Sequence, residues 1–98
     1  MSVRREIEIE APPEEVWEAV STEEGRERWL VDDRDVLVET IEAPNRLVWW
    51  WSDEREDAFT RVELEIVAVP AGSRVVVVES APTFPLTLLA AAFASVAV

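Results

Sequence analysis

The run Trp49-Trp50-Trp51 constrains the fold of this chain more than any other stretch of its sequence. It ends a segment that starts at Arg46 and is typical of a β-strand. Successive strand side chains point to opposite faces of a sheet, so Trp49 and Trp51 share one face and Trp50 lies on the other. Burying one Trp is worth about 4–6 kcal/mol as an upper bound. A single helical layer covers only one face of a sheet. The tryptophan on the other face must therefore contact a partner or a ligand, or remain exposed to water.

The composition indicates one acidic globular domain over residues 1–98. Hydrophobic residues make up 49% of the chain and charged residues 31%, which excludes a disordered chain. The formal net charge is -12, with nine basic residues that are all Arg. Such a surface repels phosphate backbones and anionic headgroups, so we expect no binding to nucleic acid or to membrane surfaces.

Four missing residue types exclude much of enzyme chemistry. The chain has no Cys, His, Lys or Tyr. A thiolate nucleophile, a Ser-His-Asp triad, a Schiff base and an ordinary zinc or haem site are therefore excluded. We therefore expect no cofactor and no metal, and we assign no catalytic residue. We expect a protein that is not an enzyme.

The N-terminal segment is read as the start of the folded domain. Residues 3–10 alternate between apolar and charged side chains and contain no apolar signal region. We therefore expect a cytoplasmic protein.

Alternating and helical patterns predict an α+β domain with a mostly sequential antiparallel sheet. In the first strand Val3, Ile7 and Ile9 face inward, and Arg5 is the inward exception. Thr22 is a predicted N-cap between two short helices. The expected strands are 3–10, 36–42, 46–52, 59–69 and 74–80, and the expected helices before the second strand are 13–20 and 23–30.

The segment 83–98 carries no charged residue and predicts a C-terminal helix. Leu86, Leu89 and Phe93 fall on one face at helical spacing, and the opposite face, which includes Leu88, is hardly more polar. The segment is too short for a membrane span, which needs about 20 residues. A helix that is apolar all round is normally buried all round, so we expect a homo-oligomer such as a dimer.

Four stretches of the chain, in order, carry a family resemblance: residues 8–20, residues 29–30, residues 42–51 and residues 60–64. Together they resemble the SRPBCC, or START-like, superfamily, which has the helix-grip fold. Within it they are most similar to the branch related to the activator of the ninety-kilodalton heat-shock protein ATPase. The resemblance covers about residues 3–80.

The resemblance implies an abbreviated helix-grip domain that binds an apolar or amphipathic small molecule, uncharged or cationic, between its sheet and its C-terminal helix. That branch usually has one or two further strands and a longer last helix. The same side chains can instead form a filled core, which is the default for a small domain. The candidate ligand-binding residues are Trp17, Trp29, Trp49, Trp51, Val62, Leu64, Phe84 and Leu88.

Two other functions remain open. The branch implies a co-chaperone-like role, in which the acidic domain docks on a chaperone or another protein partner. Trp50, on the outer face of the sheet, is the first candidate for such a contact. The candidate interface residues are Trp50, Leu86, Leu89 and Phe93. The third function is a cyclase-like enzyme that uses Glu or Arg.

Several polar residues have two interpretations. Arg5 and Arg61 can bind a ligand carboxylate or enolate, but we favour a cross-strand ion pair for Arg5. Glu39 and Glu79 can be buried acids or bases, but we favour outward, solvated side chains for both. The acidic runs 32–35 and 53–57 lack the ligand spacing of a calcium loop, so we interpret them as solvated connectors.

Overall fold

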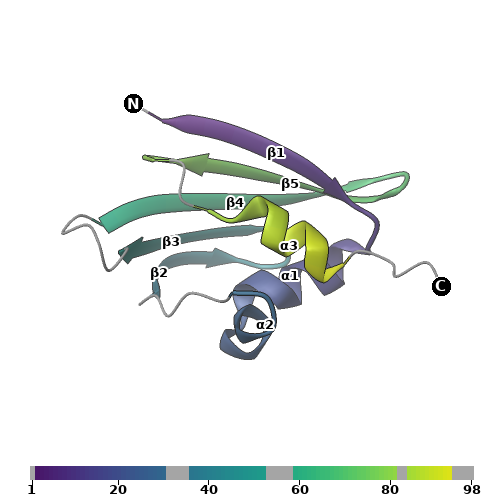
Figure 1. Cartoon of the computed structure of the whole chain (residues 1–98), viewed down its shortest axis with the longest axis horizontal. Coiled ribbons are helices and arrows are strands. Elements are labelled where there is room, and N and C mark those ends of the chain that lie inside the picture. The colour runs from purple at the N-terminus through teal and green to yellow at the C-terminus, as the bar shows by residue number, and fades with distance from the viewer. Residues whose placement is uncertain (1, 31–35, 53–58, 82–83, 94–98) are drawn as a thin grey trace.

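The computed structural model describes residues 2–30, 36–52, 59–81 and 84–93, and Figure 1 shows their arrangement. The strands are β1 (Val3–Ile9), β2 (Val36–Glu42), β3 (Arg46–Ser52), β4 (Phe59–Val69) and β5 (Gly72–Glu79), and the helices are α1 (Pro13–Ser21), α2 (Glu23–Glu27) and α3 (Leu86–Ala92). The five antiparallel strands form one curved sheet in the order β1-β5-β4-β3-β2. This confirms the predicted α+β class.

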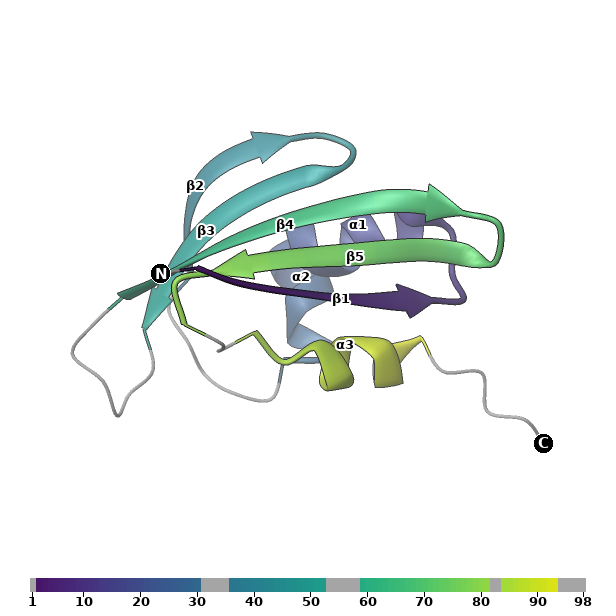
Figure 2. The ribbon, with the colours of Figure 1, turned by 90° about the horizontal axis from the view of Figure 1, so that it is seen from above.

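The described helices lie on one face of the sheet, as the two views of Figures 1 and 2 show. Helix α1 packs against β4 and β5, and α3 lies along β1. The inward residues of the strands meet these helices in one hydrophobic core. The opposite face carries no helix in the described part of the chain. We call these the covered face and the open face.

The junction of α1 and α2 explains why the first helix stops where it does. Thr22 Oγ1 donates to Glu18 O at the end of α1 and accepts from Gly25 N at the start of α2, both at 2.9 Å. This confirms Thr22 as the predicted N-cap. A Cβ on Gly25 would lie 2.2 Å from Glu18 O, so only glycine permits this close approach of the two helices.

The β4–β5 turn uses the second of the chain's two glycines. Gly72 has a φ of 148°, and a Cβ there would lie 2.3 Å from Ile9 O. The neighbouring Ser73 is buried and donates to Ala11 O at 2.7 Å. The turn is thereby fastened to the end of β1, and it closes one end of the core.

Strand β2 departs from the predicted alternation. A register shift between Val38 and Thr40 pairs Val38 with Trp49 but Thr40 with Val48. Strict alternation over 36–42 would place Ile41 on the face of Leu37 and Glu39, but Ile41 pairs with the inward Leu47. A bulge inserts one residue into the alternation, and the sequence pattern alone does not mark where it falls.

Two helices are shorter than predicted. Helix α2 ends at Glu27 instead of residue 30, and α3 covers Leu86–Ala92 of the predicted 83–98. Residues 83 and 94–98 lie outside the described residues. Within α3 the predicted division of faces is confirmed, since Leu86 and Leu89 are buried whereas Thr87 and Leu88 are exposed.

Candidate functional site

An aromatic cluster occupies the covered face of β3. It consists of Trp29 from the segment after α2, Trp49 and Trp51 from β3, and Phe84 from the segment before α3. The ring centroid of Phe84 lies 5.6 Å from that of Trp29, 5.8 Å from Trp49 and 5.9 Å from Trp51. The two strand tryptophans are 5.2 Å apart. Phe84 is therefore the residue around which the three indoles gather.

Trp29 is held in the cluster from the side of α1. Its indole Nε1 donates to Ala19 O at 2.8 Å, and the ring is buried. Trp29 lies in the turn after α2, where its backbone N–H donates to Arg26 O at 3.3 Å, so the turn, the indole hydrogen bond and the ring packing together set its position. The sequence predicted Trp29 for the ligand site but did not indicate that the end of α1 anchors it.

Arg26 of α2 brings a positive charge to the edge of the cluster. Its guanidinium carbon lies 5.7 Å from the centre of the Trp49 ring, and Nη1 donates to Val20 O at 3.0 Å. Burial lowers the pKa of Arg26, an effect that the nearby charge of Glu23 partly opposes. The guanidinium favours the electron-rich face of the indole, a cation–π arrangement. Arg26 was not among the candidates from the sequence.

Trp49 carries an unsatisfied donor inside the cluster. The side chain is fully buried, and its Nε1 has no hydrogen-bond partner in the described part of the chain. A buried donor without an acceptor costs about 1–3 kcal/mol. The covered face therefore contains a polar group that an acceptor oxygen could satisfy.

Arg5 and Glu79 hold the backbone of Phe84. Glu79 Oε2 accepts from Arg5 Nη2 at 2.7 Å and from Arg5 Nε at 3.1 Å, while Oε1 accepts from the Phe84 backbone N–H. Arg5 Nη2 also donates to Phe84 O at 2.6 Å. The ion pair thus binds both the donor and the acceptor of one residue.

The structure corrects one prediction here and confirms another. The outward position favoured for Glu79 was wrong, because its side chain is 0% exposed on the covered face. Strand β5 places Val on both of its faces, so the pattern could not assign one to Glu79. The cross-strand ion pair favoured for Arg5 is confirmed. The sequence did contain a signal for Glu79: an inward Arg5 requires a carboxylate partner on the same face of the sheet.

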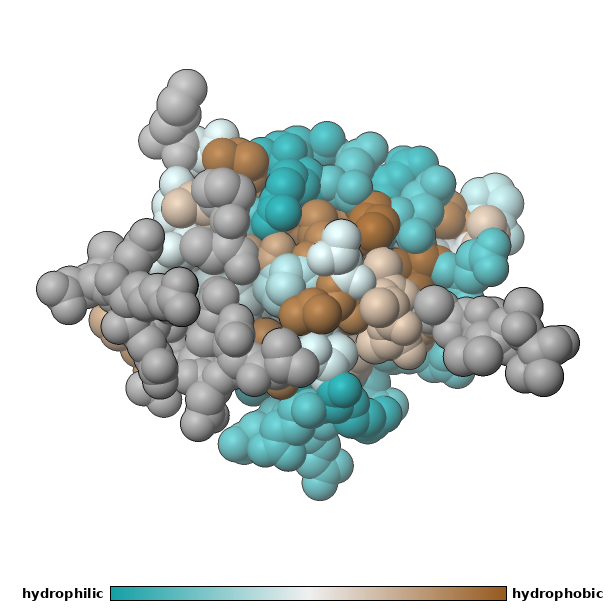
Figure 3. All heavy atoms as spheres, in the orientation of Figure 1, coloured by the Kyte–Doolittle hydropathy of each residue, from teal (hydrophilic) through white to brown (hydrophobic). Residues whose placement is uncertain are grey.

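The other candidate ligand-binding residues separate into two groups. Val62 and Leu64 are buried on the covered face beside Trp49 and Leu47, and Trp17 packs partly buried against the same core. Leu88 is 37% exposed on the outer side of α3, so it does not join the aromatic cluster. Figure 3 shows apolar surface over and beside α3, between polar surfaces of β1 and α2.

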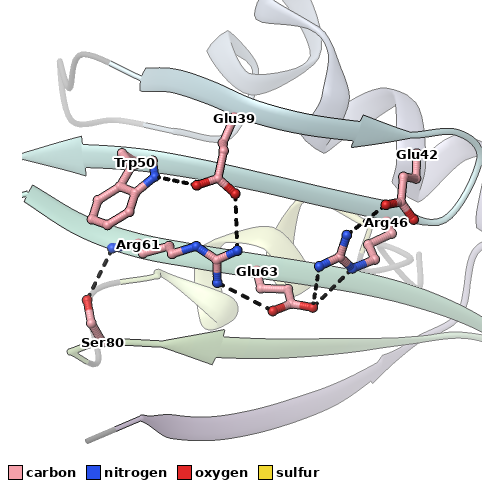
Figure 4. A network of polar contacts seen from close by, with 7 residues as sticks. All are labelled: Glu39, Glu42, Arg46, Trp50, Arg61, Glu63 and Ser80. Carbon is pink, nitrogen blue, oxygen red and sulfur yellow. Dashed lines mark hydrogen bonds and ion pairs between the residues drawn. The ribbon is translucent and has the colours of Figure 1, made fainter.

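The open face carries a polar network around Trp50, shown in Figure 4. Trp50 Nε1 donates to Glu39 Oε1 at 3.0 Å, and Arg61 Nη2 donates to Glu39 Oε2 at 3.1 Å. Arg61 and Arg46 both pair with Glu63, and Arg46 also pairs with Glu42. The outward position predicted for Glu39 is confirmed, and the β2 bulge brings it over Trp50.

This network shifts two pKa values. Hydrogen bonds from Arg61 and then from Trp50 lower the pKa of Glu39. The hydrogen bond to Glu63 and the charge of that carboxylate raise the pKa of Arg46. Both shifts favour the charged forms, so the network is a set of satisfied ion pairs rather than an acid or base prepared for proton transfer.

The predicted interface residues lie at different depths. Trp50 is half-buried on the open face, beside Leu37, which is 58% exposed and pairs with it in register. Leu86 and Leu89 are buried in the chain's own core, and Phe93 packs partly buried against it. Whether any of them contacts a partner stays a prediction.

Among the described residues, no three acidic side chains gather where they could hold a metal ion. The acidic runs 32–35 and 53–57 lie outside these residues. No helix of the described ranges is long and apolar enough to cross a membrane.

Neither a protein-family model nor a curated protein sequence matches the chain. Several solved structures do. Protein BH1534 of Bacillus halodurans is 25% identical, with a TM-score of 0.66 over 83% of this chain and 69% of that one. The Aha1 dimer of Colwellia psychrerythraea is 15% identical, with a TM-score of 0.65 over 89% and 82%.

A third structure is DynU16, a protein of the dynemicin biosynthetic locus. It is 24% identical, with a TM-score of 0.69 over 92% of this chain but 40% of DynU16. At these identities the likeness concerns the fold. The curved antiparallel sheet with helices on one face is the helix-grip plan, and the chain has an SRPBCC-like fold.

Proposed function

We propose that this domain binds an apolar or amphipathic small molecule between its sheet and α3. The observation that carries the proposal is the aromatic cluster, in which the rings of Trp29, Trp49 and Trp51 surround Phe84 on the covered face. Flat aromatic walls with few polar groups are typical of small-molecule sites. The buried Trp49 N–H adds a donor that could orient an acceptor oxygen of the ligand.

The fold shared with DynU16, a protein of the dynemicin biosynthetic locus, is consistent with a small-molecule role. The acidic chain, with its net charge of -12, favours a molecule that is uncharged or cationic. Arg26 lies over the face of Trp49 and is bonded to Val20 O. It therefore has a protein acceptor of its own and does not require an anionic ligand.

The test is a titration with Nile red, an uncharged apolar dye that fluoresces when it leaves water. We expect saturable binding together with quenching of tryptophan emission. Trp50→Phe is the matched control, because Trp50 lies on the open face; it should bind the dye as the wild type does. Dye binding that does not saturate, or that Trp50→Phe abolishes, would contradict the proposal.

A second function is favoured by the apolar side chains of the open face. Leu37 is 58% exposed beside Trp50, and Phe59 at the start of β4 is 51% exposed. Acidic side chains, among them Glu39 and Glu63, lie close by. Exposed apolar groups with a charged rim suit protein docking. The fold shared with the Aha1 dimer is consistent with a co-chaperone-like role.

The purified domain can be tested for stimulation of the ATPase of a ninety-kilodalton heat-shock protein. We expect Leu37→Glu and Phe59→Glu to remove any stimulation. Val67→Glu is the matched control, since Val67 is 37% exposed on the same strand face as Phe59 but at the other end of β4. No stimulation by the wild type, or equal loss in all three variants, would exclude this function.

We also propose a homodimer through the uncharged outer side of α3, where Leu88 is exposed. Every strand carries charged side chains, whereas α3 carries none, so two acidic chains repel least along this helix. Sedimentation velocity should show a dimer that Leu88→Glu converts to a folded monomer. A monomeric wild type would rule this interface out.

A further inference from the structure

We propose that Phe84 occupies the place of the ligand. The ligand is then an aromatic molecule in which an N–H donor and a C=O acceptor flank the carbon that carries the ring. An N-acyl aromatic amino acid amide is a molecule of this kind. The inference rests on the proposed small-molecule function and names the class of molecule that the site takes.

The first argument is the way in which the ring is bound. Phe84 is 1% exposed, and its ring meets three indoles that come from two separate segments. The Trp51 ring stacks on it with an interplanar angle of 25°. Aromatic contacts of this kind add about 0.5–1.5 kcal/mol each beyond burial. The cluster is therefore a receptor for one flat ring.

The second argument is the way in which the backbone is bound. Neither polar group of Phe84 is left to water: Glu79 Oε1 accepts its N–H, and Arg5 Nη2 donates to its carbonyl oxygen at 2.6 Å. Leu86 N also donates to this oxygen at 2.9 Å. The two side-chain partners come from β1 and β5, which are paired neighbours in the sheet, and they are bonded to each other through Glu79 Oε2.

The third argument is where Phe84 sits in the chain. It belongs to no helix or strand, and it lies between the end of β5 and the start of α3. No ladder hydrogen bond is broken if it leaves its position. The indoles, Arg5 and Glu79 would then present an unoccupied ring site with a donor and an acceptor at its edge. A molecule with the same three groups can replace Phe84 contact by contact.

Phe84 then acts as an internal competitor. A tethered group competes at an effective concentration in the millimolar range, so it weakens binding of a free ligand without any change in the site. Removal of the ring should leave a receptor that binds the mimic more tightly. This separates the present proposal from a general affinity for apolar molecules.

The test uses N-acetyl-L-phenylalanine methylamide as the probe and Phe84→Ala as the receptor. Calorimetry or tryptophan fluorescence should show saturable binding, at least about tenfold tighter than to the wild type. Two matched probes measure separately how much the ring and the N–H group contribute to binding. N-acetyl-L-alanine methylamide lacks the ring and should not bind measurably. The analogue methylated on the acetylated nitrogen lacks the donor to Glu79 and should bind about tenfold more weakly.

Phe84→Val serves if Phe84→Ala does not fold, because it keeps some apolar packing while leaving room for a ring. The ¹⁵N resonance of Arg5 Nε should also shift on addition of the full probe and not on addition of the ringless one. Equal binding to wild type and variant, or equal binding of the methylated probe, would overturn the proposal while leaving Nile red binding intact. If Nile red binds neither protein, the proposed function fails and this inference fails with it.

Discussion

Trp51 and Trp50 are neighbours in sequence, but the sheet places them in opposite environments. Trp51 is 1% exposed on the covered face and stacks on Phe84. Trp50 is half-buried on the open face, where its N–H is bonded to Glu39 and its neighbours are ion pairs. On the covered face several aromatic rings pack together and are buried, whereas on the open face a single indole lies among charged side chains. The same side chain therefore contributes to a core or to a surface according to the parity of its position in the strand.

The largest expected difference between the two faces is in stability. Trp51→Ala should lower the free energy of unfolding by about 3–5 kcal/mol, because it leaves a cavity among Trp49 and Phe84. Trp50→Ala should lower it by about 1 kcal/mol, since the ring is only half-buried and loses one hydrogen bond. Urea unfolding of both variants measures the two values. Similar losses would contradict the division into a covered and an open face.

The ion pair of the covered face should also contribute more to the free energy of unfolding than the ion pairs of the open face. Glu79→Ala leaves the buried Phe84 N–H without its acceptor and the partly buried Arg5 guanidinium without its ion-pair partner, at a cost of about 2–4 kcal/mol. Glu39→Ala should leave the urea midpoint close to that of the wild type, because its partners Arg61 and Trp50 can turn to water. An equal fall in both midpoints would show that the open-face network stabilises the fold as much as the Arg5–Glu79 pair does.

The smallest expected effect is a shift in the titration of Glu39. Its pKa lies below the ordinary value of a glutamate because Arg61 and Trp50 donate to it. Ionised Glu39 therefore stabilises the fold above the pKa of the unfolded chain, and this contribution is lost as the pH falls through the lowered folded-state pKa. Carbon-detected NMR should record the low value, and Arg61→Leu should raise it. An unchanged titration in Arg61→Leu would remove Arg61 as the cause.

Much of the fold could be predicted from the sequence because local patterns and tertiary burial agree along most of the chain. The alternation of β1 gives its inward residues correctly, including the inward Arg5. The bulge in β2 could not be predicted, since nothing in its pattern marks the extra residue that turns Ile41 toward Leu47. The end of α2 was also misplaced, because Arg28 caps the helix without a glycine or proline signal.

The candidate site was only partly predictable. Trp29, Trp49, Trp51 and Phe84 were candidates through the resemblance to helix-grip proteins, and the structure brings them into one cluster. Leu88 was a candidate on the same ground, but it is exposed on the outer side of α3. The Arg5–Glu79 pair joins residues 74 positions apart in the sequence, and no local pattern reports a contact of that separation.

The sequence by itself determined which side of the sheet each of the three tryptophans occupies, because strand geometry sends successive side chains to opposite faces. Its missing residue types also excluded much of enzyme chemistry. Only the tertiary structure decided what those side chains meet: that Phe84 fills the space between the indoles, that Arg5 and Glu79 hold it there, and that Glu39 reaches Trp50. Such contacts depend on how distant segments pack, and packing is set by the whole fold rather than by local spacing.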